Sequence, residues 1–304
     1  MASRDASWSV ASDRSITLTS PLVMGILNAT PDSFHDGRSD YRDLEVMLHA
    51  GCAMVDEGAD IIDVGGESTR PGSLRVDPQE QCHRTTGIIQ QLSEQRDCLI
   101  SIDTTHARVA SEALDAGALI VNDVSAGTED PALFPLVAAR GCGLILMHRL
   151  AQPGDDVYSD QYPVAPEYGS AGVVPAVAEF LLERMESAHQ AGVAPEQVVL
   201  DPGLGFGKSV EQNLDLVRGL PELTSLLGRP VLIGASRKSF IGSILGERPP
   251  GGRLFGSLAV AALAARSGAS LLRCHDVRPT RDVLELVEAV ERPLHGSGGT
   301  IHHR

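Results

Sequence analysis

The sequence predicts an α/β fold, a single (β/α)8 TIM barrel that follows a short N-terminal extension. Three observations favour it. Eight short apolar runs alternate with helical patterns, a polar residue ends or follows each run, and no change of composition interrupts the series. Eight such units in about 270 residues suit a closed barrel, which typically needs about 250 residues. A doubly wound parallel sheet is the alternative, and the unbroken series favours closure over it.

The predicted strands are short and apolar, as expected for parallel strands buried on both faces. They span residues 22–27, 61–64, 99–102, 119–121, 144–147, 198–200, 231–234 and 271–273. The helices that follow are predicted over residues 41–57, 78–92, 106–116, 131–140, 173–191, 210–227, 253–267 and 280–290. Glycines at 58, 117 and 141 are typical helix stops. The barrel domain should therefore span residues 21–292.

The two ends of the chain lie outside this repeating pattern. Residues 1–20 alternate weakly at Trp8-Ser-Val10 and Ile16-Thr-Leu18, which indicates a small hairpin. Residues 293–304 are rich in glycine and histidine, and we expect a disordered tail there.

The composition of the chain argues against several classes of protein. The chain has 304 residues, 42% of them hydrophobic, and a formal net charge of −15, which argues against a nucleic-acid partner. No apolar run approaches the roughly 18 residues that span a membrane. The N-terminus lacks a signal-peptide pattern, so we expect a cytoplasmic protein with no membrane partner. Five scattered cysteines without CxxC spacing indicate free thiols rather than disulfides or a zinc site.

Polar side chains gather where the predicted strands end. Asp103, Asn122 and Asp201 come at the ends of strands three, four and six. In a barrel these ends meet at one mouth, where acids and amides would suit a heterocycle with several donors, such as a pterin or purine. Each residue alone could instead cap a helix, but their combination favours a binding site. A second set could bind an anion: Asn28, Arg70, Arg273 and His275.

The glycine-rich loop at residues 203–209 invites comparison with phosphate-binding loops. The sequence Gly207-Lys208-Ser209 resembles the end of such a loop, but Pro202 stands where the motif requires glycine. The spacing of glycines also misses the dinucleotide fingerprint. The loop alone therefore predicts no nucleotide site.

Longer motifs carry a family resemblance. Residues 24–34 (MGILNATPDSF) and 58–72 (GADIIDVGGESTRPG) closely resemble the two signatures of the dihydropteroate synthase family. Further matches lie at residues 101–104, 121–125, 200–208, 236–239 and 273–277. The resemblance covers about residues 21–290, in the expected order and spacing.

The resemblance implies a barrel enzyme, usually homodimeric, that acts in folate biosynthesis. Such enzymes condense 6-hydroxymethyl-7,8-dihydropterin diphosphate with 4-aminobenzoate to give 7,8-dihydropteroate and diphosphate. The implied catalytic residues are Asp103, Asp201, Lys238, Arg273 and His275. The pterin contacts would be Asp103, Asn122, Asp201, Lys238 and Arg273. The 4-aminobenzoate pocket would comprise Phe34, Thr69, Pro71, Phe206, Lys208 and Ser236. The diphosphate would meet Asn28, Arg70, Arg273 and His275, and Asn28 would also ligate Mg²⁺.

Two departures from the family pattern stand out. The family usually continues Met-x-Gly after the histidine at position 148, whereas Arg149 follows here, so a methionine of the pterin pocket is lost. His35 replaces the commoner serine in the first loop. Two other functions remain open at this point. One is an inactive pterin-binding paralogue, and the other is a barrel that transfers methyl groups from methyltetrahydrofolate to a corrinoid.

Overall fold

The barrel is built from short buried strands. A computed structural model describes residues 6–29 and 41–292 of the chain. Its parallel strands are β3 (Leu22–Asn28), β4 (Ile61–Gly65), β5 (Leu99–Asp103), β6 (Ile120–Asp123), β7 (Gly143–Met147), β8 (Val198–Asp201), β9 (Leu232–Ile233) and β10 (Leu271–Cys274). Each lies within two residues of its predicted bounds. The first-loop residues Phe34 and His35 and the predicted tail lie outside the described residues.

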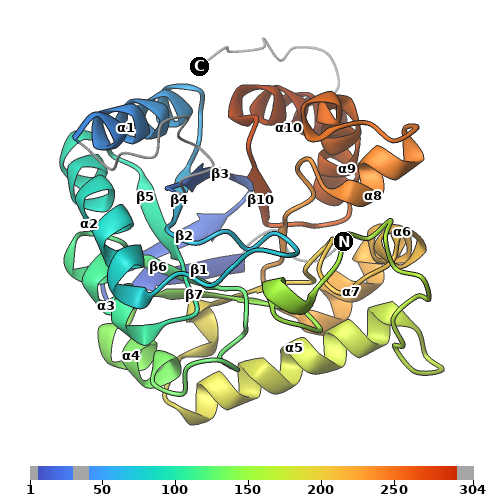
Figure 1. Ribbon diagram of the computed structural model, residues 1–304, viewed down its shortest axis with the longest axis horizontal. Coiled ribbons are helices and arrows are strands. Elements are labelled where there is room, and N and C mark those ends of the chain that lie inside the picture. The colour runs from blue at the N-terminus through green and yellow to red at the C-terminus, as the bar shows by residue number, and fades with distance from the viewer. Residues whose placement is uncertain (1–5, 30–40, 293–304) are drawn as a thin grey trace.

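The strands form a ring. Their order in the sheet is β8-β7-β6-β5-β4-β3-β10-β9, with every neighbouring pair parallel (Figure 1). An isolated parallel bridge between Leu200 and Val231 brings the two end strands together. The Leu200 N–H also donates to the Pro230 carbonyl at 3.0 Å. The predicted (β/α)8 barrel is therefore confirmed, with one bridge closing the ring.

Helices surround the strands and pack against their outer faces (Figure 1). They are α1 (Tyr41–Asp56), α2 (Pro78–Gln95), α3 (Ala107–Asp115), α4 (Leu133–Arg140), α5 (Val173–Gln190), α6 (Val210–Arg218), α7 (Leu220–Leu227), α8 (Ser239–Ile244), α9 (Leu254–Arg266) and α10 (Val277–Glu291). Short 3-10 turns lie at Pro153–Asp155, Pro195–Gln197 and Pro250–Gly252. In the part of the chain that the structure describes, no helix is long and apolar enough to cross a membrane.

Two helical predictions were incomplete. The single helix predicted over 210–227 is divided at Gly219 into α6 and α7. Pro221 lies in the first turn of α7, where its missing N–H is tolerated, but it could not continue an intact helix. A Cβ on Gly219 would also approach Val174 Cγ2 to 2.7 Å. The short helix α8 was not predicted, because six residues carry too little periodicity to be recognised.

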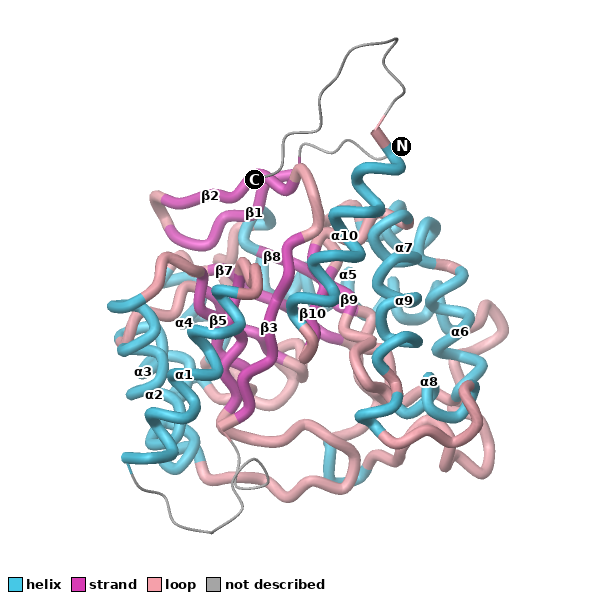
Figure 2. Tube along the Cα trace, turned by 90° about the horizontal axis from the view of Figure 1, so that it is seen from above, coloured by secondary structure: helices cyan, strands magenta, loops and turns pink. Residues whose placement is uncertain are grey.

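The N-terminal extension closes one end of the barrel. Strands β1 (Ala6–Ala11) and β2 (Arg14–Leu18) form the predicted antiparallel hairpin. Its Trp8 is fully buried and donates from Nε1 to the Gln197 carbonyl at 2.8 Å. Trp8, Val10 and Leu18 pack on an apolar layer made by the barrel strands: Met24, Ile61, Leu99, Ile120, Ile145, Val199, Leu232 and Leu271. Figure 2 shows the hairpin at one end of the barrel and the long loops at the other. The loop end is thus left for a site.

Candidate active site

One arginine joins three strand ends at the mouth of the barrel. Arg273, on β10, donates from Nε to Asp63 Oδ2 at 2.7 Å and from Nη2 to Asp103 Oδ2 at 2.8 Å. Asn122 donates from Nδ2 to the same Asp63 oxygen at 3.1 Å. The sequence analysis did not assign Asp63 to the site. Its position on the second apolar run was visible, but nothing in the sequence showed that Arg273 and Asn122 would meet on it.

This cluster holds acceptor atoms that the protein leaves open. Asp63 Oδ1 and Asp103 Oδ1 are buried, and no described residue donates a hydrogen bond to either. A buried carboxylate oxygen without a donor costs about 1–3 kcal/mol or more, so native folds rarely keep one without a function. Burial raises the pKa of the Asp103 carboxyl to about 7, although the charge of Arg273 opposes this shift. The open oxygens therefore suit a ligand with several N–H donors.

The glycine loop holds a second carboxylate in place. Asp201 ends β8 and accepts from the Gly203 N–H at 2.7 Å. Gly203 has φ +67°, and a Cβ there would lie 1.9 Å from the His148 carbonyl oxygen, so only glycine fits this turn. Burial raises the pKa of Asp201 to about 6, against the effect of the Gly203 hydrogen bond.

A lysine and a phenylalanine share the wall beside Asp201. The ammonium of the half-buried Lys238 lies 3.8 Å from the centroid of the Phe206 ring, which places a cation over an aromatic face. Burial and the charge of Arg273 lower the pKa of Lys238 to about 7, while Asp201 and Asp103 oppose the shift. Phe206 itself packs with Val124 and Met147. The predicted pterin pocket, which includes Lys238, therefore adjoins the predicted 4-aminobenzoate pocket, which includes Phe206.

Lys208 is placed differently from the expectation that it lines the aminobenzoate pocket. Its side chain has no exposed surface. Its Nζ lies 2.9 Å from the Gly203 carbonyl, 2.8 Å from the Phe206 carbonyl and 2.9 Å from His148 Nδ1. The loop coils around the ammonium, so Lys208 braces the loop from inside instead of facing the mouth. Burial lowers the pKa of Lys208 to about 7, partly offset by Asp201.

Ser236, on the loop after β9, and His275, directly after β10, form a pair at the mouth. Ser236 Oγ lies 3.0 Å from His275 Nδ1 and also accepts from the His275 backbone N–H at 3.2 Å. Burial and the nearby charges of Arg237 and Arg273 lower the pKa of His275 to about 3, so its imidazole is neutral at pH 7. Arg237 itself is held by two hydrogen bonds to Asp276, at 3.1 and 2.6 Å. Because Nδ1 contacts the serine hydroxyl, Nε2 is the ring nitrogen left to meet a ligand.

The remaining described residues of the predicted site lie on the loop after β4 and at the end of β3. Thr69 and Pro71 are half-buried and Arg70 is exposed, on the loop between β4 and α2. The charge of Arg70 contributes to lowering the pKa of His275, so the two side chains share one electrostatic environment. Asn28 ends β3, in register with Gly65 on β4. The predicted residue Phe34 lies outside the described part of the chain.

The donors fit Mg²⁺ only as a metal shared with a substrate. Within residues 6–29 and 41–292, no three His, Cys, Asp or Glu side chains cluster as metal ligands. Mg²⁺ often keeps several waters and takes one or two protein oxygens together with phosphate oxygens. The amide oxygen of Asn28, at a strand end of the mouth, suits a single protein ligand of this kind.

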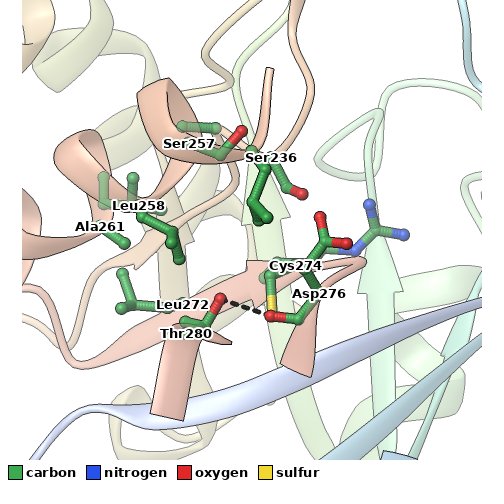
Figure 3. A pocket seen from close by; sticks show the side chains of 12 residues that line it. Ser236, Ser257, Leu258, Ala261, Leu272, Cys274, Asp276 and Thr280 are labelled. Atoms are coloured by element: carbon green, nitrogen blue, oxygen red, sulfur yellow. Dashed lines mark hydrogen bonds between the residues drawn. The ribbon is translucent and has the colours of Figure 1, made fainter. Parts of the chain in front are cut away.

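A small cavity lies behind the mouth, between β9, β10 and α9. It measures about 20 Å³, room for one water molecule, and its lining includes Ser236, Cys274 and Thr280 (Figure 3). Burial raises the pKa of the Cys274 thiol to about 11. Cys274 is therefore a packing residue, and the cavity is too small for a substrate.

Known proteins are similar to this chain in both sequence and fold. A family described as pterin binding enzyme matches residues 24–275. The chain is 46% identical to the dihydropteroate synthase of Mycobacterium leprae, over 88% of this chain and 92% of that protein. It is 43% identical to the dihydropteroate synthase of Synechocystis, over 89% of this chain and 90% of that protein. A solved structure of Xanthomonas albilineans dihydropteroate synthase with 4-aminobenzoic acid superposes with a TM-score of 0.84, at 41% identity, covering 94% of this chain and 98% of that one.

These similarities span most of the barrel, from β3 to the end of β10. They agree with a site whose open acceptors lie on β4 and β5, beside the carboxylate of Asp201 at the end of β8. The chain belongs to the pterin binding enzyme family and, within it, to the dihydropteroate synthases.

Proposed function

We propose that this protein condenses 6-hydroxymethyl-7,8-dihydropterin diphosphate with 4-aminobenzoate, releasing 7,8-dihydropteroate and diphosphate. The observation that carries the proposal is the buried set of Asp63, Asp103, Asn122 and Arg273, which leaves carboxylate oxygens open at the mouth of a barrel closely similar to dihydropteroate synthases.

The pterin is held by strand-end residues. Its amino and ring N–H groups match the carboxylates of Asp103 and Asp201, and Asn122 can both donate and accept. Lys238 adds a donor for the carbonyl edge. Arg273 is fixed by two ion pairs, so its planar guanidinium presents a defined face on which the ring can stack. Because these groups are positioned before binding, little reorganisation accompanies recognition.

Breaking the bond between the pterin methylene and the diphosphate spreads positive charge into the pterin ring. The carboxylates of Asp103 and Asp201 stabilise that charge in a site largely shielded from water. The leaving diphosphate is bound by Arg70, Arg273 and the neutral His275. Asn28 would hold Mg²⁺, which when bound would supply further positive charge for the leaving group.

The aromatic amine of 4-aminobenzoate attacks a carbon that is already electron-poor, so no strong base is needed. Phe206 offers an apolar wall for its ring, and Ser236 a polar contact. Thr69 and Pro71 lie on the loop that borders this side of the mouth. Exclusion of water by these loops would protect the cation from hydrolysis.

The protein is also proposed to form a homodimer in the cytoplasm. Helices α9 and α10 expose large apolar side chains: Phe255 at 80%, Leu263 at 52%, Leu286 at 66% and Val290 at 75%. Exposed apolar groups on neighbouring helices support burial against a second copy. All five cysteines are free thiols, which supports a reducing compartment.

One assay tests the activity. Purified protein is supplied with pterin diphosphate, 4-aminobenzoate and Mg²⁺, and diphosphate release is followed with and without the arylamine. Release that requires the arylamine supports the synthase. A protein that binds pterin without releasing diphosphate would be an inactive paralogue. Transfer of a methyl group from methyltetrahydrofolate to a corrinoid would identify the methyltransferase instead.

A further inference from the structure

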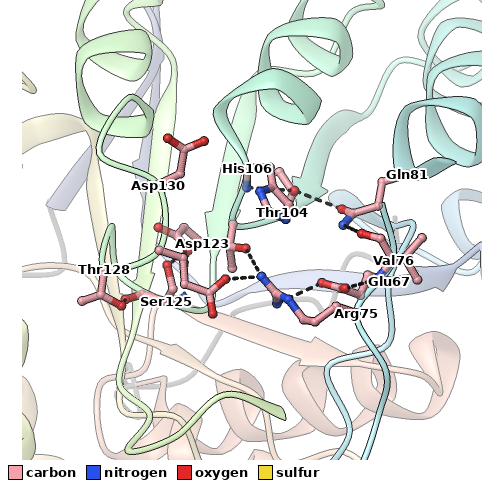
Figure 4. A network of polar contacts seen from close by, with 12 residues as sticks. Glu67, Arg75, Val76, Gln81, Thr104, His106, Asp123, Ser125, Thr128 and Asp130 are labelled. Carbon is pink, nitrogen blue, oxygen red and sulfur yellow. Dashed lines mark hydrogen bonds and ion pairs between the residues drawn. The ribbon is translucent and has the colours of Figure 1, made fainter. Parts of the chain in front are cut away.

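Ion pairs and a hydrogen bond join the loops that follow four consecutive strands, outside the pterin cluster. Glu67 follows β4, Thr105 follows β5, Glu129 lies after β6 and Arg149 follows β7. Arg75, on the loop between β4 and α2, contacts the first three of them: it donates to Glu67 at 3.2 Å, to Thr105 at 3.2 Å and to Glu129. Figure 4 shows Arg75 directed towards Glu67 within this network.

Glu129 is the centre of the network. Its carboxylate accepts from Arg75 with one oxygen and from Arg149 with the other. The Arg149 side chain is only 6% exposed and that of Glu129 only 9%, so little water competes with this pair. Burial alone would raise the pKa of Glu129, but a hydrogen bond from Thr105 and the charges of Arg149 and Arg75 outweigh it and lower that pKa. The carboxylate is therefore ionised at neutral pH.

Polar contacts, rather than apolar packing, hold the loop of residues 66–77. Leu74, its large apolar side chain, is 87% exposed. The carboxylate of Glu67, near the start of the loop, accepts hydrogen bonds from the Val76 N–H at 2.6 Å and from Arg75, both near its end. Further along, the Gly72 N–H donates to the Pro153 carbonyl at 2.7 Å, which ties this loop to the one after β7.

The segment Thr69–Pro71 lies between these attachments. It begins two residues after Glu67 and ends immediately before Gly72. The loop after β7 that supports Gly72 begins at Arg149, whose guanidinium is bound to Glu129. Both loops therefore meet on one carboxylate from a third loop.

We propose that Glu129, held by Arg149, is a positioning residue that fixes the Thr69–Pro71 segment at the mouth and thereby sets the affinity for the arylamine substrate. This inference rests on the proposed function for its kinetic part only. Arg149 occupies the position where the family pattern usually has methionine, so the charged bridge accompanies a change of the pocket lining at β7. Neither Glu129 nor Arg149 is assigned to contact the substrates.

The test compares Glu129→Gln, Arg149→Met and Arg149→Lys with the wild type. Asp115→Asn is the matched control, because it removes the charge of an exposed ion pair with Arg140, away from the mouth. Hydrogen exchange of peptides covering residues 66–77 is measured first, since it does not depend on activity. KM for 4-aminobenzoate, kcat and the Kd of 6-hydroxymethylpterin, which lacks the diphosphate, are then measured.

We expect Glu129→Gln and Arg149→Met to speed exchange over residues 66–77 and to raise KM for 4-aminobenzoate about fivefold or more. In Glu129→Gln, which leaves the pterin lining untouched, the Kd of 6-hydroxymethylpterin should change less than about twofold. Arg149→Lys should recover most of the affinity, because an ammonium can still pair with Glu129. Unchanged exchange and unchanged KM in folded variants would overturn the inference. A wild type without synthase activity would refute the proposed function, and the exchange data would still decide whether Glu129 orders the loop. If Glu129→Gln fails to fold, Arg75→Met removes one of its ion pairs from the more exposed side.

Discussion

The two ends of the barrel are built from the same strands but from opposite kinds of side chain. On β4, Ile61 belongs to the apolar layer beneath Trp8, and two residues later Asp63 binds Arg273. On β10, Leu271 lies in that same layer, and two residues later Arg273 lies at the mouth. Side chains two apart on a strand point to the same face, so both pairs face the barrel interior.

Along each strand, the apolar end therefore contributes mainly to stability and the polar end mainly to function. The apolar end stabilises the fold by removing large side chains from water, at about 25 cal/mol per Å². The polar end buries carboxylates, and among the described residues two of their oxygens have no donor, which costs free energy until a ligand supplies one. We therefore expect substitutions at one end to change unfolding and those at the other to change turnover.

The largest expected effect is at the apolar end. Trp8→Ala removes a fully buried indole and its hydrogen bond to Gln197, and we expect a loss of about 3–5 kcal/mol in the free energy of unfolding. Urea unfolding measures it. Trp8→Phe is the control, because it keeps a ring in the cavity and should lose clearly less. The kcat of the protein that remains folded should be near normal. A large loss of kcat without loss of stability would contradict the separation of the two ends.

At the polar end, Asp103→Asn should lower turnover about 100-fold or more, because it removes the carboxylate that stabilises the positive charge as it develops. The free energy of unfolding should change little or increase, since the buried carboxylate is itself unfavourable. Steady-state kinetics and urea unfolding on one preparation test both parts. Asp115→Asn, the same chemical change at an exposed position, is the control. Near-normal turnover of Asp103→Asn would remove Asp103 from the catalytic set.

Lys208, in the glycine loop, and Lys238, beside it, extend the comparison between stability and function to the mouth itself. Lys208→Met leaves two backbone carbonyls and His148 without their partner, and we expect a loss of about 1–3 kcal/mol in the free energy of unfolding. Lys238→Met should instead lower kcat/KM with little change in stability, because its ammonium lies over Phe206 and makes no comparable set of bonds. Denaturant unfolding of both variants decides between these roles. Equal stability losses would show that both lysines brace the loop.

Most of the fold could be predicted because buried parallel strands are short apolar runs with polar residues at one end. The run at 61–64, for example, needed only its hydrophobicity and its place in the series to be recognised as a strand. The division at Gly219 could not be predicted, because it depends on the approach of Val174 from α5 as well as on Pro221. Helix α8 is too short for a periodic signal.

The site could be predicted where side chains follow directly from strand ends, as for Asp103, Asn122 and Asp201. Lys208 shows the limit of this reasoning. Its inward position is set by the coil of the loop and by His148, sixty residues away in the chain. Asp63 was visible as a strand residue, but its contacts with Arg273 and Asn122 depend on closure of the whole barrel. Long-range contacts of this kind leave no local pattern in the sequence.

The smallest expected effect is on the pH dependence of kcat/KM, which is set by the titratable groups at the polar end. Burial raises the pKa of Asp103 to about 7 and that of Asp201 to about 6, so each carboxyl becomes neutral as pH falls below its own value. Burial lowers the pKa of Lys238 to about 7, so its ammonium becomes neutral as pH rises above that value. If activity needs the ionised form of all three, kcat/KM for the pterin substrate should fall on each side, by at least about tenfold for each pH unit beyond these pKa values. Lys238→Arg keeps its charge across the range and should abolish the alkaline fall while leaving the acid fall in place. Measuring kcat/KM between about pH 5 and 9 for both proteins is decisive. An alkaline fall that persists in Lys238→Arg would assign it to another group. The pterin site would then depend on the carboxylates of the strand ends without requiring a protonated Lys238.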